Sequence, residues 1–226
     1  MSRVFVIPDL HCPVMLPKFL TFLQRTRDKH RCTKVVSIGD IVDWSSISYH
    51  PKAPSLKNSE AEFEKAYKQV AKVVKAFPRA QHMIGNHDCL TERQAGDAGL
   101  PLSVLKSFGD LWGLGKKWTV HPRYADLVID GVIYRHGDKG KGGQHNPALA
   151  NAQCEHASVV QGHFHACAGV NYFANLKTRI FGLQVGCGVD HDTAAMSYGA
   201  KFSKKPILGC GVVIDGETAI FEPMKL

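Results

Sequence analysis

Five short apolar segments of this chain end in acidic, histidine or amide residues, and this repeated pattern constrains the fold more than any other feature. The first segment, FVI at residues 5–7, is followed closely by Asp9 and His11. Burying a carboxylate costs free energy unless a helix N-terminus, a hydrogen-bond network or a metal ion compensates for the lost hydration. The residues at the other four segment ends decide among these explanations.

The first half of the chain is predicted to alternate between strands and helices. In chain order we expect a strand at 3–7, a helix at about 14–29, a strand at 33–40, a helix at 59–77 and a strand at 80–88. The second helix has Ser59 as a candidate cap, and Pro78 lies just past its end. This order implies a parallel sheet, because parallel strands need crossover connections.

The second half is predicted to contain strands joined by tight turns. We expect strands within 125–137, 156–165, 169–188 and 206–223. The first of these ranges resembles a hairpin that turns at Asp130-Gly131, and residues 91–116 form a helical or irregular excursion. No internal repeat, low-complexity tract or linker is found. We therefore predict one α/β domain over residues 1–226, built on two sheets.

The composition is typical of a soluble globular protein, with 44% hydrophobic and 21% charged residues. No apolar run approaches the length of a membrane span, and the N-terminus has no signal-peptide pattern. Without a membrane span, we expect no membrane partner. The seven cysteines include no CxxC pair, and with no signal peptide we expect reduced thiols and a cytoplasmic location. The net charge of +8 suggests affinity for polyanions, including nucleic acid.

The polar residues at the predicted strand ends form five short motifs. In chain order these are Asp9-x-His11, Gly39-Asp40-x-x-Asp43, Gly85-Asn86-His87-Asp88, His136-Gly137 and Gly162-His163-x-His165. Ligands of open α/β sheets lie beyond the carboxyl ends of the strands, so the motifs are expected to share one site. Carboxylate, imidazole and amide donors without thiolates suit divalent Mn, Fe, Zn, Ni or Mg.

Two metal ions held close together need about seven protein ligands and one bridging carboxylate. The motifs supply seven candidates, which are Asp9, His11, Asp40, Asn86, His136, His163 and His165. The five motifs, in this order, resemble those of the calcineurin-like metallophosphoesterase superfamily. That resemblance implies a two-sheet β-sandwich flanked by helices, in a four-layer α/β/β/α arrangement.

The resemblance also implies a role for each motif residue. One ion would be held by Asp9, His11, Asp40 and His165, and the second by Asp40, Asn86, His136 and His163. Asp40 would bridge the two ions. His87 would be the catalytic histidine, which protonates the leaving oxygen or stabilises the charged phosphoryl oxygens, and Asp88 would orient it. Asp43 matches a structural position that ties loops together.

The resemblance implies a cofactor of two divalent ions, with Mn²⁺ favoured and Fe, Zn, Ni or Mg also compatible with the donor set. The ions would polarise the phosphoryl oxygens and acidify a bridging water. The resulting hydroxide would attack phosphorus in line with the leaving alcohol, without a covalent enzyme intermediate.

The residues beside the motifs narrow the class of phosphoester. Phosphoprotein phosphatases of the superfamily carry an arginine after GDxxD and another before GNH, whereas this chain has Trp44 and Ile84 there. The pattern is closer to the Mre11/SbcD-type nucleases and small phosphodiesterases, so we expect a nucleic-acid or nucleotide diester as substrate. A phosphomonoesterase acting on proteins or small molecules, and a non-catalytic protein-binding scaffold, are the alternatives. The sequence assigns no oligomeric state.

The segment RHGDKGKGGQHN at 135–146 places Lys139 and Lys141 shortly after His136. These lysines form either a solvated basic loop or a lip that contacts substrate phosphates. The sequence leaves both interpretations open.

Overall fold

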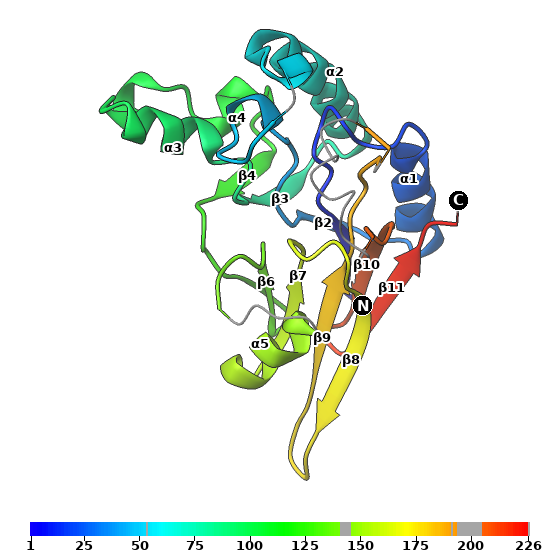
Figure 1. Ribbon diagram of the computed structural model, residues 1–226. Coiled ribbons are helices and arrows are strands. Elements are labelled where there is room, and N and C mark those ends of the chain that lie inside the picture. The colour runs from blue at the N-terminus through cyan, green and yellow to red at the C-terminus, as the bar shows by residue number, and fades with distance from the viewer. Residues whose placement is uncertain (53, 141–145, 191, 194–204, 226) are drawn as a thin grey trace.

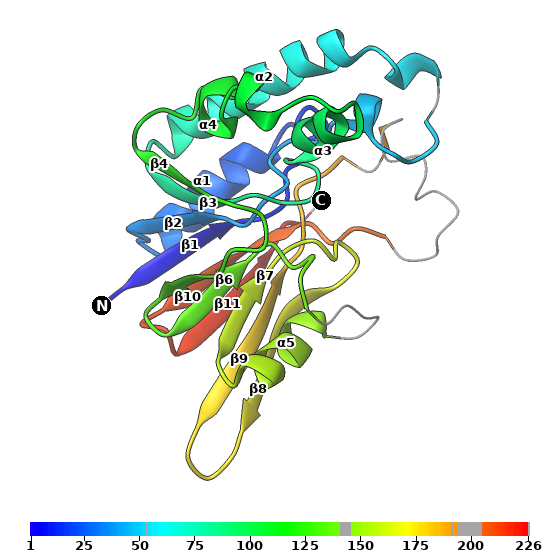
Figure 2. The same ribbon diagram turned by 90° about the vertical axis from the view of Figure 1, so that its left-hand side faces the viewer.

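The computed structural model describes residues 1–52, 54–140, 146–190, 192–193 and 205–225 (Figure 1). Two β-sheets pack against each other, and helices cover their outer faces (Figure 2). This is the predicted four-layer α/β/β/α sandwich.

The first sheet carries the predicted parallel strands at its centre. It contains β1 (Arg3–Ile7), β2 (Lys34–Ser37), β3 (Ala80–Met83), β4 (Trp118–His121), β10 (Gly209–Ile214) and β11 (Thr218–Pro223). The strand order is β11-β10-β1-β2-β3-β4. Strands β1 to β4 are parallel, whereas β10 and β11 extend the sheet in antiparallel fashion on the other side of β1.

The second sheet is also mixed. It contains β5 (Leu127–Ile129), β6 (Val132–Arg135), β7 (Ser158–Gln161), β8 (Ala168–Ala174) and β9 (Arg179–Val185), in the order β5-β6-β7-β9-β8. Strands β5 and β6 form the predicted hairpin. Its turn residues Asp130 and Gly131 have φ of 52° and 77°, as the tight turns of hairpins require. Strands β6 and β7 are parallel, so their carboxyl ends lie side by side.

Helices cover both sheets on their outer sides. They are α1 (Phe19–Lys29), α2 (Ser59–Ala76), α3 (Leu90–Asp97), α4 (Phe108–Leu111) and α5 (Pro147–Glu155), with 3₁₀ turns η1 (Ser45–Ile47), η2 (Pro54–Leu56) and η3 (Leu102–Val104). Figure 2 shows α1, α2 and α4 over the first sheet, while α5 packs on β7 and β9 of the second. Among the helices described, none is both long and apolar enough to cross a bilayer.

Three details of the helices differ from the prediction. Helix α1 begins at Phe19 instead of residue 14, because the preceding backbone is already bonded: the amide of Leu16 donates to the carbonyl of Gly188. Helix α2 is capped by Asn58, whose side chain accepts from the amide of Ala61, and not by Ser59. Helix α5 was not predicted.

Two hydrophobic cores hold the layers together, and β1 contributes to both. Its alternate residues point to opposite faces of the sheet. Phe5 faces the helices and stacks on Phe77 with ring centroids 5.6 Å apart. Val6 faces the second sheet in the core that includes Leu183. Both faces of β1 are therefore buried, one against the helices and the other against the second sheet.

Candidate metal centre

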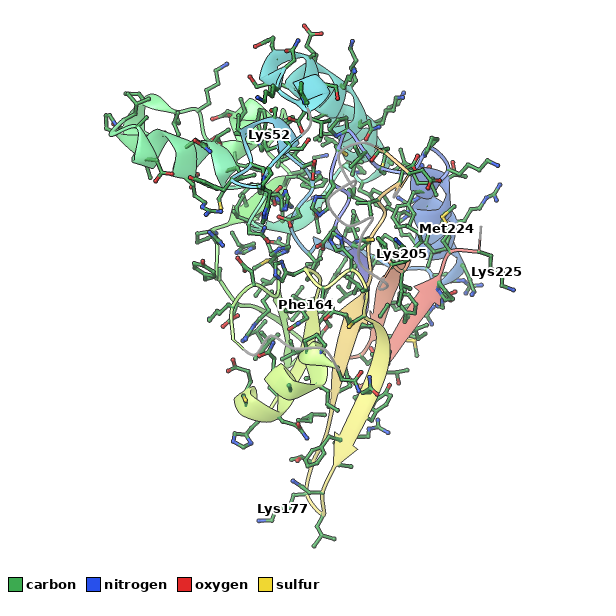
Figure 3. All side chains as sticks on the ribbon, viewed as in Figure 1. Lys52, Phe164, Lys177, Lys205, Met224 and Lys225 are labelled. Carbon is green, nitrogen blue, oxygen red and sulfur yellow. The ribbon has the colours of Figure 1, made fainter. Side chains whose placement is uncertain are left out.

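The five predicted motifs meet at one edge of the molecule, beyond the carboxyl ends of the parallel strands. They follow directly after β1, β2 and β3 of the first sheet and after β6 and β7 of the second. Phe164, labelled in Figure 3, belongs to the motif that follows β7. The two-sheet packing therefore brings together residues that lie as far apart in the sequence as Asp9 and His165.

The loops after β1 and β2 are joined by backbone hydrogen bonds. The amides of Leu10 and His11 both donate to the carbonyl of Asp40, at 3.0 and 2.9 Å. His11 and Asp40 have φ of 49° and 45°, a left-handed conformation that is uncommon for residues with a side chain. The paired backbones hold both residues in this conformation, with their side chains directed to a common point.

A first cluster contains Asp9, His11 and His165, whose ligand atoms all lie within 4.8 Å of one another. Nε2 of His165 is 3.1 Å from Oδ2 of Asp9 and 3.2 Å from Nε2 of His11. The other oxygen of Asp9, Oδ1, is buried and accepts no hydrogen bond from any described residue. Asp9 is thus a buried carboxylate with one oxygen, Oδ2, close to an imidazole nitrogen and the other without a hydrogen bond, which fits a bound cation.

A second cluster contains Asp40, His136 and His163, again with ligand atoms within 4.8 Å of one another. Nε2 of His136 lies 3.2 Å from Oδ2 of Asp40 and 3.0 Å from Oδ1 of Asn86. Nδ1 of the same ring donates to the carbonyl of Ile38. This bond leaves Nε2 to face the cluster, which is the arrangement of a metal-ligating histidine.

Asp40, a member of the second cluster, also forms a group with His11 and His87 whose ligand atoms lie within 4.8 Å of one another. Its Oδ2 lies 3.7 Å from Nε2 of His11 in the first cluster and 3.2 Å from Nε2 of His136 in the second. Its Oδ1 accepts a hydrogen bond from the amide of His87. All seven predicted ligand candidates are thus gathered in one place, with Asp40 between the two groups.

The electrostatics of the site attract positive charge. Burial alone would lower the pKa of His11, but its hydrogen bond to Asp43 and the neighbouring carboxylates raise that pKa to about 9. The pKa of His136 is likewise raised, against the effect of burial, to about 10 by Asp40. Burial would raise the pKa of Asp40, yet His136 and other imidazoles hold it well below its ordinary value. A divalent cation would satisfy the same carboxylates and displace these protons.

Two glycines allow the carboxylates to approach the neighbouring loops. A Cβ atom at Gly85 would overlap Oδ1 of Asp40, and one at Gly162 would overlap Oδ1 of Asp9. Any side chain at either position would displace a candidate ligand. This explains why a glycine precedes both Asn86 and His163 in the motifs.

His87 is oriented by Asp43. Its Nδ1 donates to the carbonyl oxygen of Asp43 at 2.6 Å, and the same nitrogen lies 3.5 Å from the Asp43 carboxylate. That carboxylate is buried and also bonds Nδ1 of His11 at 2.8 Å. Asp43 was predicted only to tie loops together, so its contact with two site histidines was missed. The spacing of the GDxxD motif is the sequence signal that could have revealed it.

Asp88 does not have the position expected of a group that orients His87. Its carboxylate accepts from the backbone amides of Gly85 and Val42, at 3.0 and 3.3 Å, and lies 3.2 Å from Nε2 of His82. Asp88 therefore joins the loop after β3 to the loop after β2 from the buried side. The predicted orienting role is corrected, and in this structure it falls to Asp43.

A cavity of about 380 Å³ opens over the two clusters. It is lined by His11, Asp40, His50, Asn86, His87, His163, Phe164, His165, Ala166 and Cys167. No lysine or arginine is among these residues. Lys139, a candidate substrate contact, instead binds the carboxylate of Asp126 and the carbonyl of Tyr124. Lys141, the other candidate, lies outside the described residues.

A four-layer sandwich with histidines, aspartates and an asparagine gathered at its strand ends has the architecture and donor set of a metal-dependent phosphoesterase. The family model for calcineurin-like phosphoesterases matches residues 2–167, and this chain belongs to that family. No curated protein matches the sequence.

Several solved structures are similar in outline. A variant of Vps29 from Entamoeba histolytica has 9% identity and a TM-score of 0.45, over 99% of this chain and 100% of that one. The phosphoesterase YfcE from E. coli has 12% identity and a TM-score of 0.43, and the match covers 94% of this chain and 88% of that one. The nuclease MPE from Pseudomonas putida has 12% identity and a TM-score of 0.33, and the match covers 98% of this chain and 86% of that one. The family assignment is based on the match to the family model alone.

Proposed function

We propose that this protein is a phosphodiesterase that uses two divalent metal ions to hydrolyse nucleic-acid or nucleotide diesters. The observation that carries this proposal is the position of Asp40, whose carboxylate faces an imidazole of each cluster. In the proposed site one ion is held by Asp9, His11, Asp40 and His165, and the other by Asp40, Asn86, His136 and His163. The unpartnered Oδ1 of Asp9 supports the presence of a cation.

Bound divalent ions supply Lewis acidity for the phosphoryl oxygens and make a water molecule more acidic. The protein supplies the proton at the leaving oxygen. Nδ1 of His87 is engaged by the carbonyl of Asp43, so Nε2 is the ring nitrogen that exchanges a proton in the cavity. When the ring is protonated, Nε2–H donates to the leaving oxygen as the ester bond breaks.

The charge of the cavity favours a diester over a monoester. A monoester dianion carries an additional negative charge, which is commonly met by arginine pairs. The described lining residues include neither arginine nor lysine. The two positions where phosphoprotein phosphatases carry arginine hold Trp44 and Ile84, which are both buried, and Trp44 packs against Phe63 and Trp112. The protein's net charge of +8 favours an anionic polymer or nucleotide.

The experiment that tests this function compares substrates under one set of conditions. The purified protein is supplemented with Mn²⁺ and given bis-p-nitrophenyl phosphate, p-nitrophenyl phosphate, single- and double-stranded DNA, RNA and cyclic dinucleotides. We expect hydrolysis of diesters well above that of the monoester. Preference for the monoester would replace the proposal by a phosphomonoesterase. Absence of any hydrolysis with Mn²⁺, Fe²⁺, Zn²⁺, Ni²⁺ or Mg²⁺ would favour a binding scaffold.

A further inference from the structure

Phe164 lies between two candidate metal ligands and belongs to neither hydrophobic core. It follows His163 and precedes His165, and neither of the two buried clusters includes it among its described members. Its side chain, labelled in Figure 3, is half-buried. It lines the cavity together with Ala166 and Cys167. Apart from histidines, it is the only aromatic residue among those described as lining this cavity. An apolar ring that lines a polar cavity is available for an apolar contact with a ligand.

The position of Phe164 is fixed by its backbone. Its amide donates to the carbonyl of Gly162 at 2.8 Å, and its carbonyl accepts from the amide of Cys167 at 3.2 Å. Its ring stands at 79° to the ring of His163, with centroids 4.8 Å apart. A perpendicular contact with one small ring leaves other parts of the phenyl surface available to a planar group. The ring is therefore presented to the cavity by a tight turn.

We propose that Phe164 is the stacking platform for a nucleobase of the substrate, so that the site prefers nucleoside diesters to diesters without a base. This inference rests on the proposed diesterase function and names its substrate class. Aromatic side chains bind bases of any sequence through their π faces. The neighbours of Phe164, His163 and His165, belong to the two different ligand sets, so a base on this ring has its phosphate next to both proposed ions.

The size of the cavity is compatible with a nucleotide. A volume of about 380 Å³ lies near the lower end of the range for small-molecule pockets. One unpaired nucleotide, at the end of a strand or in a dinucleotide, is the substrate unit that we propose for it.

A different role for Phe164 would be to shield the neighbouring histidines from water. Shielding needs only an apolar group, whereas stacking needs a flat ring. Phe164→Leu keeps the apolar group and removes the ring, and Phe164→Tyr keeps both. These two variants, with Phe164→Ala, separate the two roles. Phe173→Ala is the matched control, because Phe173 is an exposed phenylalanine on β8 and does not line the cavity.

The test uses two diesters with the same leaving group. Thymidine 5′-(p-nitrophenyl phosphate) carries a base, and ethyl p-nitrophenyl phosphate does not, so stacking of the nitrophenyl ring cancels in the ratio of their kcat/KM values. We expect this ratio to favour the nucleoside ester in the wild type. It should fall about 5- to 150-fold in Phe164→Ala and Phe164→Leu, the range that loss of one base stack implies. Phe164→Tyr and Phe173→Ala should keep the wild-type ratio.

A binding measurement makes the test independent of turnover. The affinities of Mn²⁺-loaded protein for thymidine 5′-monophosphate and for inorganic phosphate are compared by calorimetry, and we expect Phe164→Leu to weaken only the nucleotide. An unchanged ratio and unchanged nucleotide affinity in Phe164→Leu would overturn the stacking role. If the wild type hydrolyses neither diester, the proposed function fails, while nucleotide binding that depends on Phe164 would still support the platform.

Discussion

The carbonyl oxygen of Asp43 accepts a hydrogen bond of 2.6 Å from Nδ1 of His87. This bond fixes the tautomer of the neutral ring and turns Nε2 towards the cavity. Orientation of an imidazole by a backbone carbonyl or carboxylate is common where histidine transfers protons or binds metal.

Replacing His87 should remove proton transfer while the ions remain bound. We expect His87→Asn to lower kcat for a diester by about 10²- to 10⁴-fold, the usual contribution of general acid catalysis. The amide of residue 87, which donates to Asp40, is retained in this variant. Metal content by elemental analysis serves as the control. Near-normal kcat with a full metal complement would rule out the role given to His87.

Replacing Asp43 should weaken metal binding, because its carboxylate supports an imidazole ligand. Asp43→Asn removes the charge beside Nδ1 of His11 and should weaken metal affinity by about 10- to 100-fold, as loss of a group behind a ligand commonly does. Titration with a fluorescent metal indicator measures this change. An unaltered affinity would show that the Asp43 carboxylate does not support His11 as a ligand.

Replacing Asp88 should affect stability more than turnover. Asp88→Ala leaves the buried amides of Gly85 and Val42 without their acceptor, which should lower the free energy of unfolding by about 1–3 kcal/mol for each amide. Urea denaturation measures this loss. The folded variant should keep more activity than His87→Asn. A loss of kcat as large as that of His87→Asn, with stability unchanged, would restore Asp88 as the group that orients His87.

The binding of metal should release protons. The raised pKa values of His11 and His136, about 9 and about 10, mean that both rings hold an extra proton at neutral pH without metal. Ions must displace these protons, so affinity should fall as the pH is lowered. Calorimetry in buffers of different ionisation enthalpy counts the protons released, and a count of zero at pH 7 would contradict this account.

The same pKa values set the pH dependence of the metal-free protein. Each histidine has a higher pKa in the folded state than in the unfolded chain, where its pKa is near the ordinary value of 6.5. Their stabilising contribution is therefore complete below about pH 6.5 and is lost as the pH rises through about 9 to 10. Thermal unfolding of metal-free protein across this range should show the loss.

The sequence predicted the parts of this fold that depend on local pattern. The strand at 3–7, the turn at Asp130-Gly131 and the polar residues after each strand are all visible in the chain itself, and the structure confirms them as fold features. The start of α1 could not be predicted, since it depends on a bond between Leu16 and a residue far along the chain, Gly188.

The candidate site was likewise predictable only in part. The positions of its motifs were predictable because each follows an apolar run. The contacts of Asp88 with His82 and Val42 could not be predicted, because they depend on how β3 packs against the loop after β2. Nor could the sequence reveal that the ring of Phe164 lines the cavity, since this follows from the turn between Gly162 and Cys167.

The measurement that tests the central proposal most directly is the metal content of Asp40→Ala. Protein reconstituted with Mn²⁺ and freed of excess ions is subjected to elemental analysis, with circular dichroism as the check on folding. If Asp40 bridges the clusters, the wild type should hold two ions per chain, His165→Ala should hold one, and Asp40→Ala should hold none. Two ions retained by folded Asp40→Ala would contradict the bridge and the two-ion site built on it.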